Sequence, residues 1–351
     1  MSRKPVVLTN VLDIGGNPYL RLWGKAAVDA GVELQELTSR SVLARASRRP
    51  SWVHLQWPER AIRHLGRRAS AEELARLLAR VAIARARGAR VMLTAHNVWS
   101  HDGRHPRLER VLWGALGALT TDLHVLSEGG AIDFIEAHPQ FAGVRRRVIP
   151  HGHYGPLRLD APAREQARDE LGLPRSALVL VTFGLLKPYK GTEGLVNAFR
   201  ALDDSNARLV VAGRIVDAAL QRQLEHAARE DRRIVLQPRF LDDGELARTI
   251  RASDLVVLPY SRVLNSGSAM LALTLGRPVL VPRTRTFEEL RGQVGGEWVS
   301  LFDGPLDVAA LARVVRRPQN GTPDLAWCGW DRITVELSRT WADARIPSTA
   351  A

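Results

Sequence analysis

Strand-like apolar runs alternate with helix-like runs along nearly the whole chain, and this alternation limits the fold more than any other feature. In the first half, short runs such as Val6 to Thr9 precede segments with helical spacing, such as Pro18 to Ala30, which Gly31 closes. The pattern restarts in the second half. Two successive strand–helix arrays predict an α/β protein with two doubly wound, Rossmann-like parallel sheets facing a cleft. The length of 351 residues also favours two domains, because one core stops growing beyond about 250–300 residues.

A cluster of helix and strand breakers at 150–153 separates the two arrays. We therefore expect one domain over residues 1–152 and a second over residues 153–327. The remaining segment, 328–351, predicts a helix that crosses back to the first domain, because it carries at helical spacing the apolar residues Ile333, Leu337 and Trp341.

The apolar runs also predict individual elements. Strands are expected at 6–9, 32–37, 52–55, 91–95, 122–126, 147–149, 178–183, 207–212, 233–236, 255–258 and 278–281. Helices of the second domain are expected at about 193–202, 217–230, 243–251, 268–275 and 286–293. Ser70 and Glu73 have the spacing of a capping box, which predicts a helix that begins near Ser70.

Positive charge is concentrated in the first half of the chain. The formal net charge is +13, and residues 1–150 contribute 23 basic and 13 acidic side chains (+10) against 27 and 24 (+3) from residues 151–351. Such a surface suits an anionic membrane, an acidic substrate or a nucleic acid, although a general bias toward arginine explains it equally well. We expect no nucleic acid partner, because the sequence has no zinc-finger spacing, basic zipper or basic–aromatic strand.

The single cysteine, Cys328, excludes an intramolecular disulfide and a cysteine-based metal cluster. The sequence contains no apolar run of about 18 residues, and residues 1–5 lead directly into a strand-like segment. We therefore expect a cytoplasmic protein. Peripheral contact with the inner face of the membrane is the further option that the basic first half allows.

One loop between an expected strand and an expected helix reads Gly184-Leu185-Leu186-Lys187-Pro188-Tyr189-Lys190-Gly191. Two of the chain's four lysines, Lys187 and Lys190, fall in this loop, whereas arginine supplies nearly all other positive charge. A compact ammonium on a flexible stem suits a phosphate oxygen, and the following helix would add N–H groups. A solvated surface loop is the alternative.

Ligands of open parallel sheets bind beyond the carboxyl ends of the strands, so other loops are candidates too. Gly15 and Gly16 follow the first expected strand. His96 follows the strand at 91–95, with Asp102 a few residues later. A histidine at a strand end can act as an acid, a base or a hydrogen-bond donor to a sugar hydroxyl, or it can be purely structural.

Another loop carries small polar residues directly before a helix: Asn265, Ser266, Gly267 and Ser268. Hydroxyls and backbone amides at a helix N-terminus can form an anion cradle, although N-capping by a serine requires no ligand. Two anion-suited loops in one half of the chain favour phosphate binding. Their spacing matches neither a P-loop nor a GxGxxG dinucleotide fingerprint.

These loops resemble those of the GT-B-fold sugar-nucleotide glycosyltransferases, and most closely those of glycosyltransferase family 4 and its bacterial exopolysaccharide mannosyltransferase-like relatives. The resemblance covers nearly the whole chain. It rests on Gly15-Gly16, His96, the linker 149–152, Lys190-Gly191, Val211 to Arg214, Ala252 to Leu255 and Leu275 to Val279.

The resemblance implies that the donor diphosphate binds between the glycine loop and Lys190, with the nucleotide on the second domain and the acceptor on the first. It places His96 where the family has a histidine facing the reacting sugar. Lys187, Lys190 and Arg214 would neutralise the leaving diphosphate. We therefore expect no metal and no cofactor, with a GDP-sugar or UDP-sugar as substrate.

The chain departs from the family in two places. Leu185 stands where the family usually has arginine, and Lys187 is the residue that can substitute for it. The paired glutamates spaced eight apart are absent, and their approximate positions hold Val263 and Leu271. Recognition of the nucleotide ribose must therefore use other groups. Relatives with this serine–glycine loop include β-mannosyltransferases, although the stereochemical outcome does not carry over.

Glycosyl transfer from a nucleotide-diphosphate sugar to an acceptor hydroxyl is our main functional hypothesis, with His96 orienting or deprotonating the acceptor and Asp102 as a second candidate base. The acceptor can be a glycolipid, a polysaccharide intermediate or a secondary metabolite. A nucleotide-sugar epimerase or a sugar phosphorylase of the same fold is the alternative enzyme. A basic module that binds membrane or nucleic acid is the non-catalytic alternative.

Overall fold

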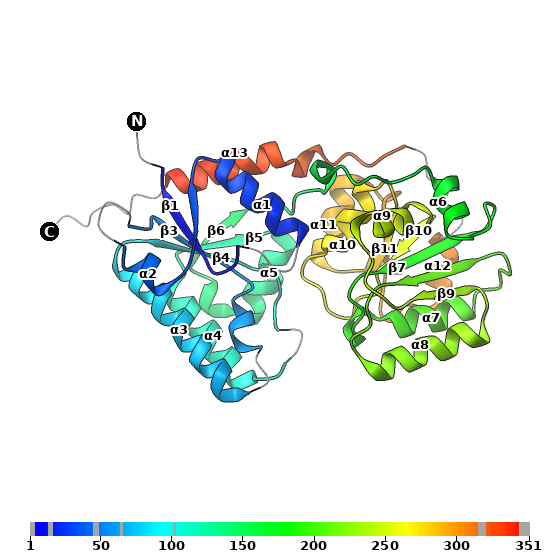
Figure 1. Ribbon diagram of the computed structural model, residues 1–351, viewed down its shortest axis with the longest axis horizontal. Coiled ribbons are helices and arrows are strands. Elements are labelled where there is room, and N and C mark those ends of the chain that lie inside the picture. Colours follow the sequence, from blue (N-terminus) through cyan, green and yellow to red (C-terminus); the bar gives the residue numbers. More distant parts are fainter. Residues whose placement is uncertain are drawn as a thin grey trace. The chain divides into compact units, whose positions relative to one another are not determined.

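The computed structural model describes residues 4–12, 17–44, 49–63, 66–100, 103–314 and 321–343. The chain divides into two compact units (Figure 1). The first comprises Met1–Gly152 and Cys328–Ala351, and the second comprises His153–Trp327. Among the described residues each unit contains one six-stranded parallel sheet, which confirms the prediction of an α/β protein built from two doubly wound sheets.

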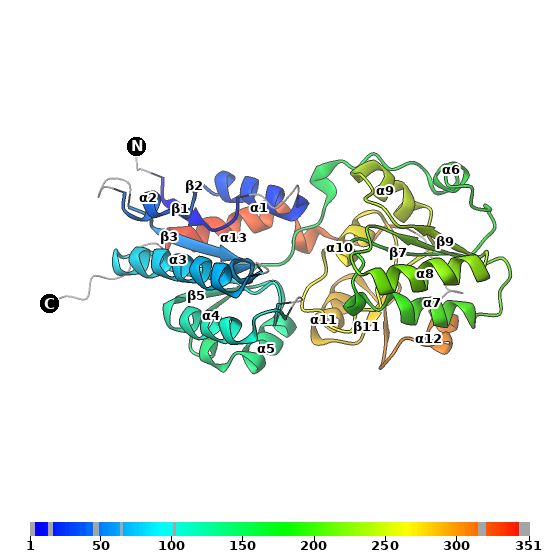
Figure 2. The same cartoon turned by 60° about the horizontal axis from the view of Figure 1, so that its bottom comes forward.

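The sheet of the first unit has the strand order β2-β1-β3-β4-β5-β6. Its strands are β1 (Val6–Thr9), β2 (Glu33–Glu36), β3 (Trp52–Gln56), β4 (Arg90–Thr94), β5 (Asp122–Val125) and β6 (Arg145–Val148). One face of this sheet is covered by α3 (Arg67–Ala86), α4 (Pro106–Leu119) and α5 (Glu128–Ala137), and the other by α1 (Pro18–Asp29) and α13 (Trp330–Ala342) (Figures 1 and 2). The remaining turns of helix are α2 (Ser39–Val42), η2 (Pro58–Ile62) and η3 (Pro139–Phe141).

Helix α13 lies beside α1, although the two helices come from opposite ends of the chain (Figure 1). The apolar side chains that predicted this helix, Ile333, Leu337 and Trp341, are buried in one core with Trp23 and Trp52. The Trp341 and Trp52 rings meet edge to face, with their centroids 5.3 Å apart. The terminal helix therefore completes the hydrophobic core of the first unit.

The sheet of the second unit has the order β12-β11-β10-β7-β8-β9. Its strands are β7 (Val179–Phe183), β8 (Arg208–Ala212), β9 (Ile234–Gln237), β10 (Leu255–Val257), β11 (Val279–Pro282) and β12 (Val299–Phe302). One face carries α7 (Thr192–Arg200), α8 (Ala218–Glu230) and α12 (Val308–Val314), and the other carries α9 (Asp243–Arg251), α10 (Gly267–Thr274) and α11 (Arg285–Val294). The shorter helices are η4 (Gly155–Leu157), α6 (Arg164–Glu170), η5 (Pro188–Lys190) and η6 (Ala326–Cys328).

The switch point of this sheet lies between β7 and β10. Chain order reverses there, so the helix after β7 and the helix after β10 pack on opposite faces of the sheet. The N-termini of both helices lie at the carboxyl ends of these two strands. The loops after β7 and β10 are the lysine loop and the loop that leads to Asn265. The topology therefore brings both anion-suited loops to one edge of one sheet.

The expectation for the start of α3 is wrong. The helix begins at Arg67 with Gly66 as N-cap, and no side chain caps it. Ser70 is buried inside the helix, where its N–H donates to the Gly66 carbonyl oxygen at 3.1 Å. Polar residues before Ser70 extend the helix by one turn, because arginine is a good helix former. Strand β12 was not among the expected strands.

Candidate active site

The lysine loop is held tightly against the loop that follows β10. Lys187 precedes the single turn η5, and Gly191, with a φ of +70°, is the N-cap of α7. A Cβ atom at Gly191 would lie 2.0 Å from the carbonyl oxygen of Pro259, so only glycine fits at this position. Helix α7 has no side-chain N-cap. Its first turn therefore presents backbone N–H groups at this edge of the sheet.

Lys190 packs on Tyr260, a residue of the loop after β10. The Lys190 Nζ atom is 3.3 Å from the Tyr260 hydroxyl and 4.3 Å from the centre of the phenol ring. Ser266 Oγ lies 3.4 Å from the same hydroxyl. Tyr260 therefore joins the lysine loop to the serine–glycine loop, and it places one ammonium at the junction.

Lys190 and Tyr260 each stabilise the charged form of the other. Burial lowers the pKa of Lys190, but attraction to Tyr260 and Tyr189 outweighs burial and leaves this pKa above its ordinary value. Burial raises the pKa of Tyr260, yet Lys190 and hydrogen bonds with Ser266 and Ser268 bring it below its ordinary value. Lys190 is consequently protonated and positively charged at neutral pH.

The serine–glycine loop provides the N-cap of α10. Ser266 Oγ accepts a hydrogen bond from the Ala269 N–H at 3.1 Å, so Ser266 does act as a structural cap. The same hydroxyl contacts Tyr260. Asn265, Gly267 and Ser268 are half-buried around it. The capping role and the proximity to Lys190 coexist, since one hydroxyl has both donor and acceptor capacity.

Lys187 and Arg214 belong to a short parallel ribbon that continues β7 and β8 beyond the sheet. We call residues 184–187 and 213–216 the strand-tip ribbon. Leu186 and Ile215 pair across it, and the Leu186 N–H donates to the Arg214 carbonyl oxygen at 2.9 Å. The ribbon begins at Gly213, where φ is +130° and a Cβ atom would lie 1.9 Å from the Gly184 carbonyl oxygen.

The strand-tip ribbon has an apolar inner face and a cationic outer face. Leu186 and Ile215 are buried in the core formed with α7 and α8. Successive side chains of an extended strand point to opposite sides, so the outer face carries Leu185, Lys187, Arg214 and Val216. Arg214 is exposed and Lys187 is half-buried. The fold thus gathers two of the predicted phosphate-binding cations on one surface.

A pocket of about 560 Å³ lies in the second unit beside the loops that carry Lys190 and Tyr260. Tyr260 and the first turn of α7, through Gly191 and Gly194, form part of its wall. Arg283 and Asp303 line it as well and form an ion pair at 2.6 Å. Pockets of this size hold small-molecule ligands.

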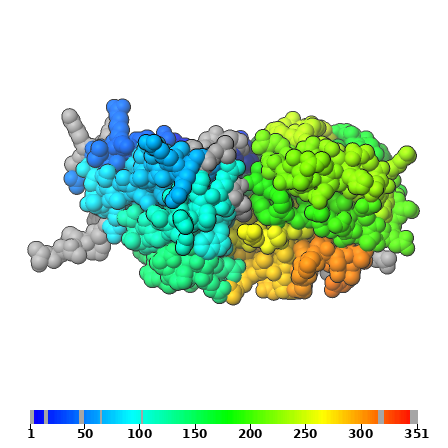
Figure 3. Space-filling model, turned by 90° about the horizontal axis from the view of Figure 1, so that it is seen from below, coloured from blue at the N-terminus to red at the C-terminus, as the bar shows by residue number. Residues whose placement is uncertain are grey.

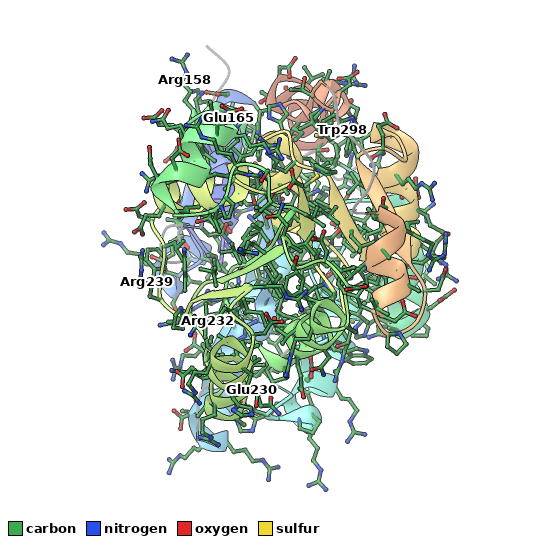
Figure 4. All side chains as sticks on the ribbon, turned by 90° about the vertical axis from the view of Figure 1, so that its right-hand side faces the viewer. Arg158, Glu165, Glu230, Arg232, Arg239 and Trp298 are labelled. Carbon is green, nitrogen blue, oxygen red and sulfur yellow. The ribbon has the colours of Figure 1, made fainter. Side chains whose placement is uncertain are left out.

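The loop after β9 forms a further part of the same sheet edge. Arg239 pairs there with Glu245 at 2.7 Å and lies at the rim of the second unit (Figure 4). The neighbouring Phe240 is 77% exposed. An exposed aromatic ring beside these strand ends offers a flat apolar surface.

In the first unit, His96 lies at the carboxyl end of β4 against the end of β3. Its ring stacks on Trp57 with the centroids 3.6 Å apart and an interplanar angle of 6°. Tyr19 meets the His96 ring edge-on at 5.5 Å. His96 Nε2 lies 3.1 Å from Gln56 Oε1. Aromatic neighbours and an amide therefore fix the position of the imidazole.

Burial holds the pKa of His96 well below its ordinary value, and the proximity of other ionisable rings lowers it further: those of His124, His151 and His54. His96 is 8% exposed. The imidazole is therefore neutral at neutral pH, and only the neutral ring can accept a proton from a hydroxyl.

Buried carboxyl groups hold the loop that follows His96. Glu59 accepts a hydrogen bond from Asn97 Nδ2 at 3.0 Å, and Glu109 accepts one from the Ser100 N–H at 2.5 Å. Burial raises the pKa of Glu59. Trp99 lies between these two anchor points and is 44% exposed. The loop thus presents one aromatic side chain on a fixed backbone.

The structure places the predicted residues in two groups. Lys187, Lys190, Arg214 and residues 265–268 gather at one edge of the second unit, and His96 lies at the edge of the sheet in the first. The predicted residues Gly15, Gly16 and Asp102 lie outside the described part of the chain. The described residues contain no group of three or more histidine, cysteine, aspartate or glutamate side chains arranged to hold a metal ion.

Sequence analysis missed three residues of these sites: Tyr260, Gln56 and Trp57. Tyr260 is 70 residues from Lys190 along the chain, and Gln56 is 40 residues from His96. The available signal was position, because each of the three lies at the carboxyl end of a strand or within three residues of it, as ligand-binding residues in parallel sheets do.

Comparison with known proteins shows what class of protein combines this fold with these sites. Residues 177–317 match the family described as glycosyl transferases group 1. A GDP-mannose:glycolipid 4-beta-D-mannosyltransferase of Xanthomonas campestris pv. campestris is 32% identical over 335 residues, which cover 93% of this chain and 88% of that protein. The chain therefore belongs to the group 1 glycosyltransferases, and it is an enzyme that transfers a sugar from a nucleotide-sugar donor.

Solved structures agree with this assignment at the level of the fold. A sucrose-phosphate synthase of Thermosynechococcus elongatus superimposes with a TM-score of 0.68 at 17% identity, covering 97% of this chain and 98% of that one. Alr3699/HepE of Anabaena, solved in complex with UDP-glucose, gives a TM-score of 0.65 at 15% identity and covers 97% and 99%. The architecture is the GT-B fold.

Proposed function

We propose that the enzyme transfers mannose from GDP-mannose to a hydroxyl group of a glycolipid. The observation that carries this proposal is the 32% identity, across nearly all of both chains, to a protein described as a GDP-mannose:glycolipid 4-beta-D-mannosyltransferase. The grouping of Lys187, Lys190 and Arg214 at one sheet edge supports the same proposal, because a diphosphate leaving group needs cations. We propose that no cofactor and no metal take part.

In the proposed reaction, the acceptor oxygen forms a bond to the anomeric carbon of the donor sugar. The bond between that carbon and the diphosphate oxygen breaks, and its electron pair leaves on the diphosphate. His96 takes the proton of the acceptor hydroxyl. Lys190 and the two cations of the strand-tip ribbon neutralise the new charge on the diphosphate. A single displacement of this kind inverts the anomeric carbon, as a β-linked product from an α-linked donor requires.

The donor part of the proposal is tested by removing the ammonium at the junction of the two loops. In Lys190→Ala we expect turnover to fall on the order of 10²-fold, because the transition state loses one preorganised cation. Release of GDP from GDP-mannose is the measurement. Lys25→Ala is the matched control, because Lys25 is 73% exposed and pairs only with Asp29 on the surface of α1. Equal turnover in both variants would contradict the proposed site.

The identity of the donor is tested by thermal unfolding with nucleotides. A ligand at 100 times its dissociation constant stabilises the protein by about 2.7 kcal/mol. We expect GDP to raise the melting temperature at a concentration at which UDP, ADP and dTDP do not. Activity that persists unchanged after treatment with EDTA would support the proposal that no metal is needed.

We also propose that the enzyme meets its acceptor at an anionic membrane surface, through the exposed side of α4. Arg107 and Arg110 are exposed there beside Val111, which is 55% exposed, whereas Glu109 of the same helix is buried. This side belongs to the surface that α3, α4 and α5 form in Figure 3. Arginines close to an anionic surface each contribute about 1 kcal/mol to binding. No helix of the described part of the chain is long and apolar enough to span a bilayer.

Co-sedimentation with vesicles tests the membrane proposal. We expect the protein to pellet with vesicles that contain an anionic lipid at low salt, and to remain in solution at high salt or when charge is reversed in Arg107→Glu/Arg110→Glu. A matched control reverses two exposed arginines of the second unit, Arg222 and Arg229. Equal binding by both double variants would contradict the assignment to α4.

A further inference from the structure

The carboxyl ends of three neighbouring strands meet at His96. The order β1-β3-β4 in the first sheet places Asn10, Gln56 and His96 side by side, each just after or at the end of its strand. Asn10 clamps the backbone of Gln56 from both sides: its Oδ1 accepts from the Gln56 N–H at 2.8 Å, and its Nδ2 donates to the Gln56 carbonyl oxygen at 2.9 Å. Gln56 therefore has little freedom to move along the strand.

The side chain of Gln56 is fully buried and faces the imidazole. Gln56 Oε1 lies 3.1 Å from His96 Nε2. An amide oxygen can only accept a hydrogen bond, so the proton of the neutral ring must sit on Nε2. The Nε2 atom of Gln56 is buried without a hydrogen-bond partner among the described residues. An unsatisfied buried donor lowers the stability of the fold, and this one accompanies the bond to His96.

The stacked aromatic rings prevent the imidazole from turning over to exchange its nitrogens. Trp57 covers one face of His96 at 3.6 Å, and its backbone has a φ of +45°, which is strained for a bulky residue. Such strain persists only where the surroundings fix the conformation, and it occurs mainly at functional sites. Helix η2 begins directly after Trp57 and holds this turn in place.

We propose that Gln56 is a positioning residue that fixes the tautomer of His96, with the proton on Nε2 and the lone pair on Nδ1. Nδ1 is then the atom that receives the proton of the acceptor hydroxyl. The second statement rests on the proposed function of His96, whereas the first does not.

The basicity of this nitrogen follows from its surroundings. The titratable groups that face His96 include the imidazoles of His54, His124 and His151 and the phenol of Tyr19. A carboxylate beside the ring would stabilise its charged form. A glutamate at position 56 would supply one: it keeps an accepting oxygen at Nε2 and raises the pKa of His96 by attraction.

The tautomer is measured directly by nitrogen NMR of protein labelled in its histidines, with His96→Gln used to assign the resonance. We expect the wild-type protein at neutral pH to show a protonated Nε2 and an unprotonated Nδ1 at His96. In Gln56→Met, which removes the amide and preserves most of its volume, we expect loss of this single tautomer. A protonated Nδ1 in the wild-type protein would overturn the proposal.

Kinetics test the functional consequence. In Gln56→Met we expect kcat to fall roughly 10- to 100-fold, the range seen when the hydrogen-bond partner of a metal-binding histidine is removed, with little change in KM for the donor. In Gln56→Glu we expect most of kcat to return at high pH and the acid limb of the pH profile to move upward. Gln35→Met, in strand β2 of the same sheet, is the matched control and should match wild type.

The outcomes separate the two statements. An unshifted pH profile in Gln56→Glu together with wild-type kcat in Gln56→Met would overturn the positioning role. Full activity in His96→Ala together with the expected NMR tautomer would leave Gln56 as the residue that sets the tautomer and would contradict only the proposed function of His96. If Gln56→Met fails to fold, Gln56→Glu and the wild-type NMR spectrum still decide the question.

Discussion

Tyr260 links the lysine loop to the serine–glycine loop. Its hydroxyl contacts Lys190 and Ser266, and its ring lies under the ammonium. A cation over an aromatic face is attracted by the ring even without a hydrogen bond. The ring and the hydroxyl therefore make separable contributions to the position of Lys190.

Two substitutions separate these contributions. Tyr260→Phe retains the ring and removes one hydrogen bond to a charged group, so we expect the affinity for GDP to fall by about 1.5–3 kcal/mol at most. Tyr260→Leu removes the ring as well and should weaken GDP binding further. Isothermal titration with GDP is the measurement. Unchanged affinity in Tyr260→Leu would show that Lys190 needs no support from this side chain.

Residue type and position were sufficient to select Lys190 and His96 as candidate site residues. A rare lysine between two glycines and a histidine at a strand end carry their own chemical signal. Tyr260 and Gln56 could not be predicted in the same way, because their roles arise from contacts with residues 70 and 40 positions away. Such contacts depend on strand order, which the sequence pattern does not specify.

At the scale of elements, the strand-tip ribbon depends on the close approach of two glycines. Gly213→Ala would place a methyl group 1.9 Å from the Gly184 carbonyl oxygen, in a backbone conformation that side chains rarely adopt. We expect destabilisation of several kcal/mol, on the order of 1–3 kcal/mol for the strained backbone alone and more for the clash. The measurement is urea unfolding followed by circular dichroism.

Gly114→Ala is the control for this prediction. Gly114 lies within α4, and a Cβ atom there would meet nothing within 4 Å. Alanine in a helix interior is favoured over glycine by roughly 0.5–1 kcal/mol. We therefore expect Gly114→Ala to be neutral or stabilising. Equal losses in both variants would show that the effect at Gly213 is not specific to the ribbon.

Helix α13 is anchored to the first sheet by charge as well as by its apolar face. Asp122, whose side chain is fully buried, pairs with Arg90 at 2.8 Å and with Arg147 at 2.7 Å. Arg147 also pairs at 2.8 Å with Asp343, just beyond the helix. The hydrogen bond from Arg147 lowers the pKa of Asp343. One guanidinium thus connects the amino ends of the strands to the C-terminal helix.

Removal of this guanidinium should be costly. In Arg147→Met we expect a loss of about 3–5 kcal/mol, because Asp122 is left with part of its buried charge uncompensated. In the control Arg145→Met the loss should stay below about 1 kcal/mol, because Arg145 is 55% exposed and pairs with Asp343 at the surface. Urea unfolding measures both. The Arg147–Asp343 pair also makes stability depend on pH, because the pKa of Asp343 is depressed. Its contribution to the free energy of unfolding is present above the ordinary aspartate pKa and is lost as pH falls through the lowered value.

Periodicity predicted most elements because buried parallel strands are short apolar runs and the covering helices carry apolar stripes. The strand over 179–183 and the helix from Trp330 differ from the expected bounds only at their ends. The prediction missed β12, although Trp-Val-Ser-Leu-Phe at 298–302 is a short apolar run of the kind that predicted the other strands. The start of α3 was wrong because Ser70 and Glu73 fit a capping box by chance. Local signals of this kind compete with tertiary packing, which decides the outcome.

At the scale of the whole molecule, the buried histidines are distributed unevenly. His54, Thr94 and His124 form a buried chain of hydrogen bonds at 2.6 and 2.8 Å, and His124 Nε2 donates to the Ile149 carbonyl oxygen at 3.0 Å. Burial lowers the pKa of His54, and it lowers that of His124 to about 4. The described histidines of the second unit, His153 and His226, are not buried. Protonation of buried histidines should therefore destabilise the first unit and not the second.

The sign of this effect follows from proton linkage. A histidine whose folded pKa is depressed binds fewer protons in the folded state than in the unfolded state, so stability is complete above the unfolded pKa of 6.5 and declines as pH falls toward the folded value. For His124 the decline between pH 6.5 and about 4 amounts to about 3 kcal/mol. Protonation would also reverse the direction of the hydrogen bond that Thr94 donates to His124 Nδ1.

Tryptophan fluorescence can follow this decline in one unit, because all the tryptophans except Trp298 and Trp327 belong to the first unit. We expect the urea midpoint measured by fluorescence to be lower at pH 5 than at pH 7.5, while hydrogen exchange of strand β7 in the second unit, corrected for intrinsic rates, changes little. His124→Gln should be less stable at pH 7.5 but should lose less on acidification, since the group that titrates is gone. A fluorescence midpoint that is the same at both pH values would mean that the buried histidine chain does not couple to folding. Any loss of stability of the first unit at lower pH would then have to come from its carboxylates, of which Asp343 is the one with the clearest depressed pKa.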